Sequence, residues 1–468
     1  MEKDQSFKKV LNRVDLLVLA FGAIIGWGWV VLSGSWINTA GSMGALIAFV
    51  IGGILVLFVG LTFAELASAI PKAGGELHFS LRAMGRSASF LTSWALVLGY
   101  FSVVCFEAVA FPTVFEYLFP NFKFVYLWTI NGWDVYLSWV LIGVIGAIFI
   151  TAFNYYGVKT ASIFQVILTV LIAIVGLMLF FGSAFGGDFN NLKPLFNDGT
   201  HGILAVLIMT PFMFVGFGVV PQVAEEAKIP YRSIGKMMVI SVVSAIVFYL
   251  VVIFGVGAAM NAEQLKHSEL PSADAMAVVY GSSLFAKVLI LGGVAGILTS
   301  WNSFIMGSSR ILYAMSLQRM MPDWFGKLHP KYKTPSRSIL VIGILSMLSP
   351  LLGRPALVWL VDAGGLSVVI GWLMVSLSFI VLRKKEPDLA RPYRAGQRSF
   401  VGYIAVVMAI FVGSLYMPGM PSSLVWPYEW IIFIIWWGIG IFFYINMKKN
   451  DHALQISPPS APVKNETT

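Results

Sequence analysis

The sequence has little charge and almost no cysteine. Of its 468 residues, 11% are charged, and its one cysteine, Cys105, cannot form a disulfide within the chain. The five histidines are scattered, and no G-x-x-x-x-G-K-[ST] phosphate loop occurs. These absences argue against a membrane-embedded enzyme, which needs clustered catalytic side chains, and against an ATP-driven pump. We therefore expect no catalytic residues and no cofactor.

What the sequence does contain is apolar residues. They make up 58% of the chain, the mean hydropathy is +0.84, and long apolar runs recur along nearly the whole length. About 20 such residues cross the hydrocarbon core of a bilayer as a helix. We predict an all-α membrane protein with twelve transmembrane helices, over residues 15–37, 42–69, 88–118, 136–154, 161–182, 203–223, 237–260, 284–314, 338–353, 357–382, 400–416 and 428–447.

The net charge of +9 reports topology rather than a nucleic-acid partner. With both termini on one side of twelve spans, only five of the 31 Lys and Arg residues fall on the other side, namely Lys123, Lys193, Lys266, Lys287 and Arg354. Positive residues concentrate on the cytoplasmic side of membrane proteins. We expect a multi-pass plasma membrane protein with both termini in the cytoplasm, no nucleic acid, and a first span that stays in place as a signal anchor.

The expected organisation is a short cytoplasmic segment, a core and a periphery. Residues 1–14 form the segment, and the core covers 15–383. The peripheral spans 11 and 12 cover 400–447. The polar residues 448–468 are expected to be a disordered cytoplasmic tail.

The first span contains an unusual cluster of glycines. Within FGAIIGWGWVVL, residues 21–32, lie Gly22, Gly26 and Gly28. Glycine inside a helix costs about 1 kcal/mol relative to alanine. Irregular backbone at membrane depth is tolerated only inside protein or along a cavity, so the cluster favours a broken helix that binds a ligand. Close packing of helices is the other interpretation.

The beginning of the chain resembles a known family. FGAIIGWG, followed by AELASAIPKAGGE at residues 64–76, is similar to the paired opening signature of the amino acid, polyamine and organocation (APC) superfamily of permeases. The segments that begin at Asn154, with N-Y-Y-G-V-K, and at Glu225, with E-E-x-x-x-P-x-R, also resemble that family. The resemblance implies a secondary transporter of an amino acid or a related amine.

A second interrupted span supports an internal repeat. Pro211, Gly216, Gly218 and Pro221 interrupt the sixth span, five spans after the first break. This spacing is typical of inverted repeats with the substrate between the two breaks. We predict a LeuT-like 5+5 inverted repeat with broken helices 1 and 6, its halves covering about 15–182 and 203–382.

An amino acid zwitterion suits two such breaks. Free N–H groups at Trp27 and Gly28 can hold a carboxylate, and free carbonyls over 212–215 can hold an ammonium. Relatives have Ser or Thr where this chain has Trp27, so we expect an indole to narrow the pocket. The predicted substrate site is Ile24, Ile25, Gly26, Trp27, Gly28, Glu107, Phe212, Phe214, Val215, Gly216, Phe217 and Gly218.

Glu107 leaves the substrate's side chain open. A carboxylate inside a span is rare and marks a functional site by default, although a hydrated residue near the extracellular mouth is the alternative. As part of the site, Glu107 favours a cationic amino acid or amine. Gly218, where relatives with cationic substrates have Glu or Asn, favours a neutral one. We expect a neutral amino acid.

The eighth span carries a candidate sodium site. Gly296, Thr299 and Ser300 lie on one helix face, and their hydroxyls could join the carbonyls of Gly22 and Ile25 around a small cation. Bonding of these hydroxyls to their own helix is the alternative. Sodium-dependent relatives have the same small-x-x-[ST]-[ST] element, and Ile172 stands where some proton-coupled relatives have lysine.

The function expected from sequence is import of an amino acid by alternating access with sodium coupling. The alternative is a proton-coupled symporter or exchanger of a cationic substrate that uses Glu107. A sensor or a channel with a transporter fold stays open, as does a monomer or a homodimer. We also expect Glu225 and Glu226 to form a solvated helix end, Asp362 to be interfacial, and 261–283 to be a polar loop.

Overall fold

The computed structural model describes residues 7, 9–119, 121–420 and 423–456. Helices dominate it. The first predicted span consists of α1 (Arg13–Ile24), α2 (Gly28–Val31) and α3 (Ser33–Ala40), and the sixth consists of α9 (Gly199–Leu207), α10 (Thr210–Phe214), the 3-10 turn η2 (Val215–Gly218) and α11 (Val219–Gln222). Both are therefore built from short pieces.

The other long helices are continuous. They are α4 (Ser42–Ala69), α6 (Arg86–Leu118), α7 (Leu137–Tyr156), α8 (Val158–Gly186), α12 (Tyr231–Ala259), α15 (Ser283–Leu317), α17 (Ala356–Lys385) and α19 (Tyr428–Ile456). Shorter helices connect or extend them, namely α5 (Glu76–Met84), α13 (Ala262–His267), α14 (Pro271–Tyr280), α16 (Ser336–Ser346) and α18 (Phe400–Leu415), with 3-10 turns η1 (Phe189–Leu192), η3 (Ala224–Glu226), η4 (Asp323–Gly326) and η5 (Ser349–Leu352).

Ten helical segments among the described residues are long and apolar enough to cross a membrane. Two shorter apolar segments, Ser336–Leu352 and Phe400–Leu415, coincide with the predicted ninth and eleventh spans. An all-helical membrane architecture agrees with the prediction. The count of twelve spans and the inverted repeat stay predictions.

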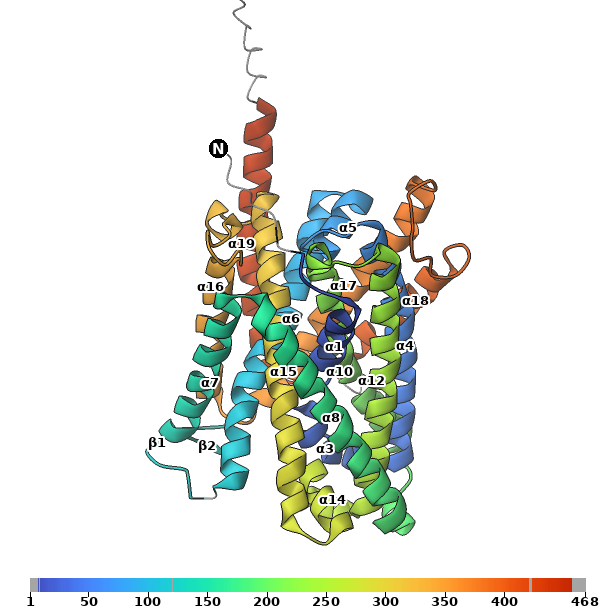
Figure 1. Cartoon of the computed structure of the whole chain (residues 1–468), viewed down its shortest axis with the longest axis vertical. Coiled ribbons are helices and arrows are strands. Elements are labelled where there is room, and N and C mark those ends of the chain that lie inside the picture. The colour runs from blue at the N-terminus through green and yellow to red at the C-terminus, as the bar shows by residue number, and fades with distance from the viewer. Residues whose placement is uncertain (1–6, 8, 120, 421–422, 457–468) are drawn as a thin grey trace, which may run out of the picture.

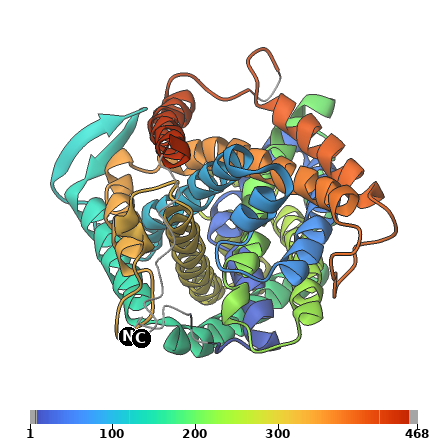
Figure 2. The same cartoon turned by 90° about the horizontal axis from the view of Figure 1, so that it is seen from above.

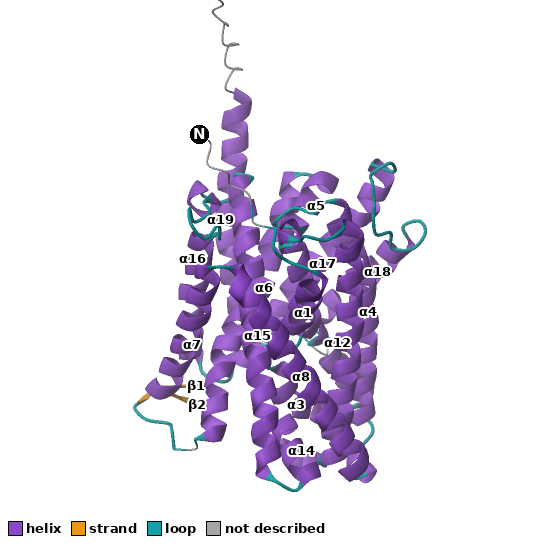
Figure 3. Cartoon of the chain, in the orientation of Figure 1, coloured by secondary structure: helices purple, strands orange, loops and turns teal. Residues whose placement is uncertain are grey.

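The long helices run along the long axis of the molecule (Figures 1 and 3). Helix α5 and the end of α19 lie at one end, which we call the termini end, and α14 lies at the opposite, far end (Figure 1). Seen from above, α18 and α19 lie at the rim of the bundle (Figure 2). Only 11% of the most apolar part of α19 is buried, against 89% for α6, so α19 belongs to the periphery and α6 to the core.

Three segments differ from the sequence-based expectation. The predicted polar loop 261–283 contains α13 and α14. Helix α19 continues to Ile456, so the first part of the tail expected to be disordered is helical, and 457–468 lie outside the described residues. Strands β1 (Tyr126–Ile130) and β2 (Trp133–Tyr136) pair antiparallel around Asn131 and Gly132, both with positive φ. Asn-Gly is a strong hairpin signal that our sequence reasoning missed.

Candidate functional site

The first interruption lies where the glycines cluster. Helix α1 ends at Ile24, Ile25 has φ −96° and ψ 76°, and helix resumes at Gly28. The chain therefore leaves the helical path over 25–27. Backbone groups that a continuous helix would pair become available here, inside the protein rather than against lipid.

The second interruption faces the first. Helix α9 gives way at Ile208, and Pro211 lacks the N–H that would continue its hydrogen bonds. Gly216 lets the two spans touch, because a Cβ there would lie 2.3 Å from the Ile24 nitrogen and 2.4 Å from the Ala23 carbonyl carbon. Any side chain at Gly216 would separate the two spans.

A small cavity lies between the two interruptions. Its volume is about 20 Å³, room for about one water molecule, so an amino acid does not fit in this conformation. The lining comes from both broken spans and from α6, α12 and α15. It consists of Ala23, Ile24, Gly26, Gly28, Val103, Phe106, Glu107, Phe212, Met213, Tyr249, Ser300 and Phe304.

Glu107 reaches the cavity from α6. It is 1% exposed, and its carboxyl accepts hydrogen bonds from the Trp27 backbone N–H and the Ser300 hydroxyl. Its Oε1 would lie 2.2 Å from a Cβ on Gly26, so only glycine leaves room for it. Its Oε2 has no hydrogen-bond partner among the described residues. The carboxyl therefore sits directly on the first interruption with one oxygen left over.

Tyr249 reaches the same cavity from α12. Its hydroxyl lies 2.9 Å from the Ile24 carbonyl oxygen and 3.1 Å from the Met213 carbonyl oxygen. These carbonyls belong to the first and the second interruption. A single buried hydroxyl thus joins the two broken spans.

Five of the twelve residues predicted for the substrate site line the cavity, namely Ile24, Gly26, Gly28, Glu107 and Phe212. The other seven are buried nearby but do not line it, namely Ile25, Trp27, Phe214, Val215, Gly216, Phe217 and Gly218. The backbone N–H of Trp27 nevertheless donates a hydrogen bond to Glu107, which lines the cavity.

The indole expected in the pocket does not line the cavity in this conformation. The Trp27 ring packs on α15, where a Cβ on Gly293 would lie 2.2 Å from it. The ring of Trp29 packs edge-on against Phe248, with 5.3 Å between centroids. Both indoles therefore point into helix contacts, and the bulk they add fills the core.

Several lining residues were not predicted. Val103 and Phe106 lie on the same face of α6 as Glu107, so helical periodicity could have identified them. Met213 lies inside the predicted carbonyl segment. For Ala23, Tyr249 and Phe304, no sequence signal distinguished them from other residues of apolar spans.

The five residues proposed for sodium lie where α1 meets α15. The Thr299 hydroxyl donates to the Gly22 carbonyl at 3.0 Å and also lies 3.1 Å from the Gly296 carbonyl of its own helix. Gly296 packs on the Ile25 carbonyl, which would lie 2.9 Å from a Cβ there. Ile172 is fully buried. The geometry is thus compatible with both the ion ligand and the bonding of Thr299 to its own helix.

The cavity is closed off from the termini end of the molecule. Arg310 Nε donates to Glu226 Oε1 at 2.7 Å, both side chains are buried, and the Glu226 carbonyl accepts from the N–H groups of Val10 and Leu11. The expectation of a solvated Glu226 is therefore wrong, because α15 and the segment before α1 cover it. Glu225 accepts from the Ala73 N–H at 3.0 Å.

The cavity is closed off from the far end of the molecule too. The Ser272 hydroxyl of α14 donates to the Trp29 carbonyl at 2.7 Å and lies 3.0 Å from the Ser33 hydroxyl. The side chain of Pro271 lies against Gly34, where a Cβ would come within 2.6 Å of it. Helix α14 thus lies directly over α2 and α3.

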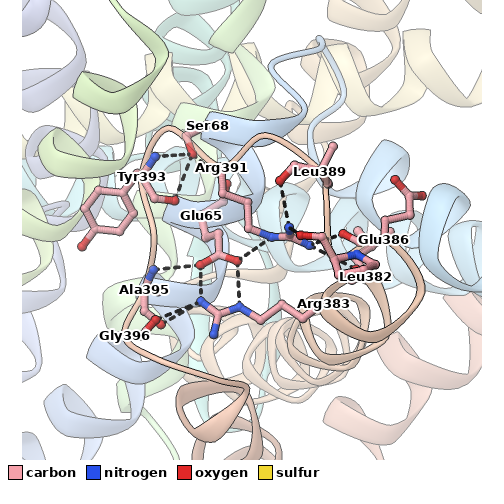
Figure 4. A network of polar contacts seen from close by, with 11 residues as sticks. Glu65, Ser68, Leu382, Arg383, Glu386, Leu389, Arg391, Tyr393, Ala395 and Gly396 are labelled. Atoms are coloured by element: carbon pink, nitrogen blue, oxygen red, sulfur yellow. Dashed lines mark hydrogen bonds and ion pairs between the residues drawn. The ribbon is translucent and has the colours of Figure 1, made fainter.

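Glu65, from the AEL part of the opening signature, has a structural role. It is fully buried and binds Arg383 of α17 and Arg391, with Nε-to-Oε1 distances of 2.9 and 3.1 Å, and it accepts from the Ala395 N–H at 2.8 Å. Figure 4 shows this network around the carboxylate. It ties α4 to α17 and to the segment that follows α17, away from the cavity.

Glu76, which ends the same signature, is buried beneath the sixth span. Its Oε1 accepts from the Tyr100 hydroxyl at 3.2 Å, and its Oε2 accepts from the Gln222 side-chain amide. Burial raises the pKa of Glu76 to about 8. Gly218 leaves space for this cluster, since a Cβ there would lie 2.3 Å from the Tyr100 hydroxyl oxygen.

Comparison with known proteins identifies the family. The amino acid permease family matches residues 11–442. The chain is 27% identical to the branched-chain amino acid permease BcaP of Bacillus subtilis, with 94% of this chain and 93% of that one covered. It is 26% identical to the methylthioribose transporter of the same organism, with 94% of each covered, and 27% identical to its aspartate-proton symporter, with 88% and 80% covered.

These relatives are named for different substrates, so sequence similarity alone does not identify the substrate of this protein. Their shared feature is transport of small molecules, and the family is made up of permeases and transporters rather than enzymes. The match covers both interrupted spans, the cavity between them and the signature glutamates Glu65 and Glu76. The chain belongs to the amino acid permease family.

Proposed function

We propose that the protein imports a neutral amino acid across the plasma membrane by alternating access, with the substrate held between the two interrupted spans. The observation that carries this proposal is the cavity shared by Gly26 and Gly28 of the first interruption and Phe212 and Met213 of the second. The termini face the cytoplasm, as the distribution of Lys and Arg indicates.

Glu107 and Tyr249 support a zwitterion as the cargo. In this conformation, the Glu107 carboxyl uses the Trp27 N–H, the group predicted to hold the substrate carboxylate. The Tyr249 hydroxyl uses the Ile24 and Met213 carbonyls, which are suited to the substrate ammonium. The carboxylate of an entering zwitterion can accept from the Trp27 N–H in place of Glu107, and its ammonium can donate to the two carbonyls in place of Tyr249. No buried backbone group is then left without a partner.

The two closures support alternating access. Glu226 and Arg310 close one end, and Ser272 and Trp29 close the other. A substrate enters or leaves when one closure opens while the other holds. Both closures join a broken span to a helix outside it, so each can open by a small movement of that helix.

The apolar lining favours a neutral side chain. Ala23, Val103, Phe106, Met213 and Phe304 surround the cavity with hydrocarbon. The relative named for branched-chain amino acids agrees with a substrate of this kind.

Sodium is the coupling ion in this proposal. Its ligands are the Gly22 and Ile25 carbonyls, the Thr299 and Ser300 hydroxyls, and the small residue Gly296 that lets α15 approach α1. The 3.0 Å contact between Thr299 and Gly22, and the absence of a lysine at Ile172, support it.

A cationic amino acid or amine is the second candidate, coupled to protons or exchanged. The unpartnered Oε2 of Glu107 favours it, because a buried carboxylate with a free acceptor suits an ammonium group.

Counterflow in proteoliposomes separates the two candidates. Proteoliposomes that contain the purified protein are loaded with one unlabelled amino acid. The rates at which labelled leucine, serine, aspartate, lysine and agmatine enter them are then compared. We expect leucine or another neutral amino acid to exchange fastest. Preferential exchange of lysine or agmatine would establish the second candidate. Flux that does not saturate with concentration would indicate a channel, and no flux at all a sensor.

A further inference from the structure

A pair of carboxyl groups lies buried between α17 and α19, apart from the substrate cavity. Asp362 is 7% exposed and Glu429 is 1% exposed. The prediction of an interfacial Asp362 concerns its depth in the membrane and stays a prediction, but its side chain is buried inside the protein. It lies six residues, or about 9 Å, along α17 from its start at Ala356. Glu429 lies in the first turn of α19.

The two carboxyl groups hydrogen-bond to each other. Such a bond needs a proton, because two ionised carboxylates in contact offer only acceptors and repel. No Lys, Arg or His side chain acts on either group among the described residues. A proton shared by the two carboxyls would supply the donor that this bond needs.

One oxygen atom of the pair has no hydrogen-bond partner among the described residues. Oδ1 of Asp362 is buried and has no hydrogen-bond partner among the described residues. Glu429 is fixed in place because its Oε2 accepts from the Val425 N–H at 2.6 Å. Val425 and Trp426 beside it are exposed, so the buried pair lies close to the surface of the protein.

Tyr416 connects this region to the sixth span. It follows α18, and its hydroxyl donates to the Ile208 carbonyl, at the point where α9 is interrupted. Gly365, one turn after Asp362 on α17, makes room for it, since a Cβ there would lie 2.6 Å from the Tyr416 hydroxyl oxygen. Tyr416 is also the titratable group that faces the pair, and electrostatic interaction links it to both carboxyls. The other helices on α17, namely α4, α5, α6 and α10, bring no charged group that acts on the pair among the described residues.

We propose that Asp362 and Glu429 form a proton-binding site, separate from the substrate cavity, whose occupancy acts on the interrupted sixth span through Tyr416. A bound proton bridges the carboxyls and holds α19 against α17. Its loss leaves two like charges in contact, which pushes α19 and the adjoining end of α18 away and withdraws the Tyr416 hydroxyl from Ile208. Protonation of the pair thus favours the closed conformation described above. The effect on transport rests on the proposed function, whereas the proton site itself does not.

Infrared spectroscopy tests the proton site without transport. A pH titration of purified protein should show the C=O stretch of a protonated carboxyl that disappears at high pH. Asp362→Asn and Glu429→Gln should each remove one component of this band, seen in the difference spectrum against wild type, whereas the component of Glu76, whose pKa is about 8, should remain. The control is Glu116→Gln, which alters a carboxylate that is ion-paired with Lys123 and should leave the band unchanged. A wild-type spectrum that matches both pair variants at every pH would overturn the proposal. Because two variants on different helices are used, one that does not fold leaves the other to decide.

Transport tests the connection through Tyr416. Uptake into proteoliposomes is followed while the outside pH is varied. Tyr416→Phe should keep the infrared band but lose the pH dependence of uptake. Tyr403→Phe, an exposed tyrosine of α18, should behave as wild type. Unchanged pH dependence in Tyr416→Phe, Asp362→Asn and Glu429→Gln would overturn the coupling. If no amino acid is transported but the band is present and lost in the pair variants, the proposed function fails while the proton site stands.

Discussion

The hydroxyl of Tyr249 lies 2.9 Å from the carbonyl oxygen of Ile24, and the same hydroxyl lies 3.1 Å from the Met213 carbonyl oxygen. One side chain of α12 therefore joins the two interrupted spans across the cavity. A substrate ammonium needs these same carbonyls. The hydroxyl and the substrate must compete, and the closed conformation without cargo depends on Tyr249.

Tyr249→Phe should reduce net uptake more than counterflow. The change leaves two buried carbonyls without their donor, which destabilises the closed unloaded carrier by about 1 to 3 kcal/mol. Net uptake needs the carrier to return unloaded, whereas counterflow does not. Substrate should bind about tenfold more tightly, since it no longer displaces the hydroxyl. The matched control is Tyr231→Phe, an exposed tyrosine on the same helix. Equal loss of both fluxes in Tyr249→Phe would contradict this role.

Gly216→Ala should abolish transport and lower the unfolding temperature. The added methyl would lie 2.3 Å from the Ile24 backbone nitrogen, and backbone cannot move aside as a flexible side chain can. Overpacking of this kind costs about 1 to 3 kcal/mol or more. Gly438→Ala on α19 is the control, because nothing lies within 4 Å of its added Cβ. Scanning fluorimetry and uptake check both variants, and wild-type behaviour of Gly216→Ala would show that the two spans are not in contact.

Glu65→Gln should destabilise the fold without altering substrate preference. The substitution leaves the guanidinium groups of Arg383 and Arg391 buried without their counter-charge, a loss of about 3 to 5 kcal/mol. Glu386→Gln is the comparison, since its ion pair with Arg82 is largely exposed and is worth about 0 to 1 kcal/mol. Thermal unfolding measures both. Similar shifts in the two variants would contradict the structural role of Glu65.

Glu76 should make stability fall as pH rises. Its pKa is about 8 in the folded protein and near 4.5 when it is exposed. At pH values between these two, Glu76 is protonated in the folded state and ionised in the unfolded state. Stability is therefore greatest below about pH 4.5, decreases by at most about 1.4 kcal/mol per pH unit up to about pH 8, and then levels off. Glu76→Gln should remove this slope. Parallel curves of unfolding temperature against pH for variant and wild type would refute the assignment.

Thr299→Ala should abolish stimulation of uptake by sodium, alone or together with Ser300→Ala. Thr299 supplies the hydroxyl closest to the Gly22 carbonyl, and its loss removes a ligand from the proposed ion site. Ser308→Ala, on the same helix, loses only bonds to its own helix and should keep the stimulation. Uptake by wild type that ignores sodium and follows a pH gradient would exclude sodium coupling.

Features that depend on local sequence could be predicted. The apolar runs placed the membrane helices, and the glycines of the first span and Pro211 of the sixth marked the interruptions, because both residue types act on the backbone where they stand. The hairpin at Asn131 and Gly132 was equally accessible.

Features that depend on a distant partner could not be predicted. Trp27 turns toward α15 because Gly293 leaves a space there. Glu226 is buried because Arg310, 84 residues away, neutralises it. Asp362 is buried because Glu429 on α19 supplies its partner. The residue pattern within one helix does not specify which side chains of the neighbouring helix it will contact. The lining of the cavity was therefore only partly predicted.

Competition by substrate analogues tests the central claim that bare backbone groups of both interruptions hold a zwitterion. Binding of labelled leucine to the purified protein is measured against unlabelled leucine, isoamylamine, which lacks the carboxylate, and 4-methylpentanoic acid, which lacks the ammonium. We expect only leucine to compete, since each analogue leaves one set of backbone groups without a partner. Isoamylamine that competes as well as leucine would contradict the account.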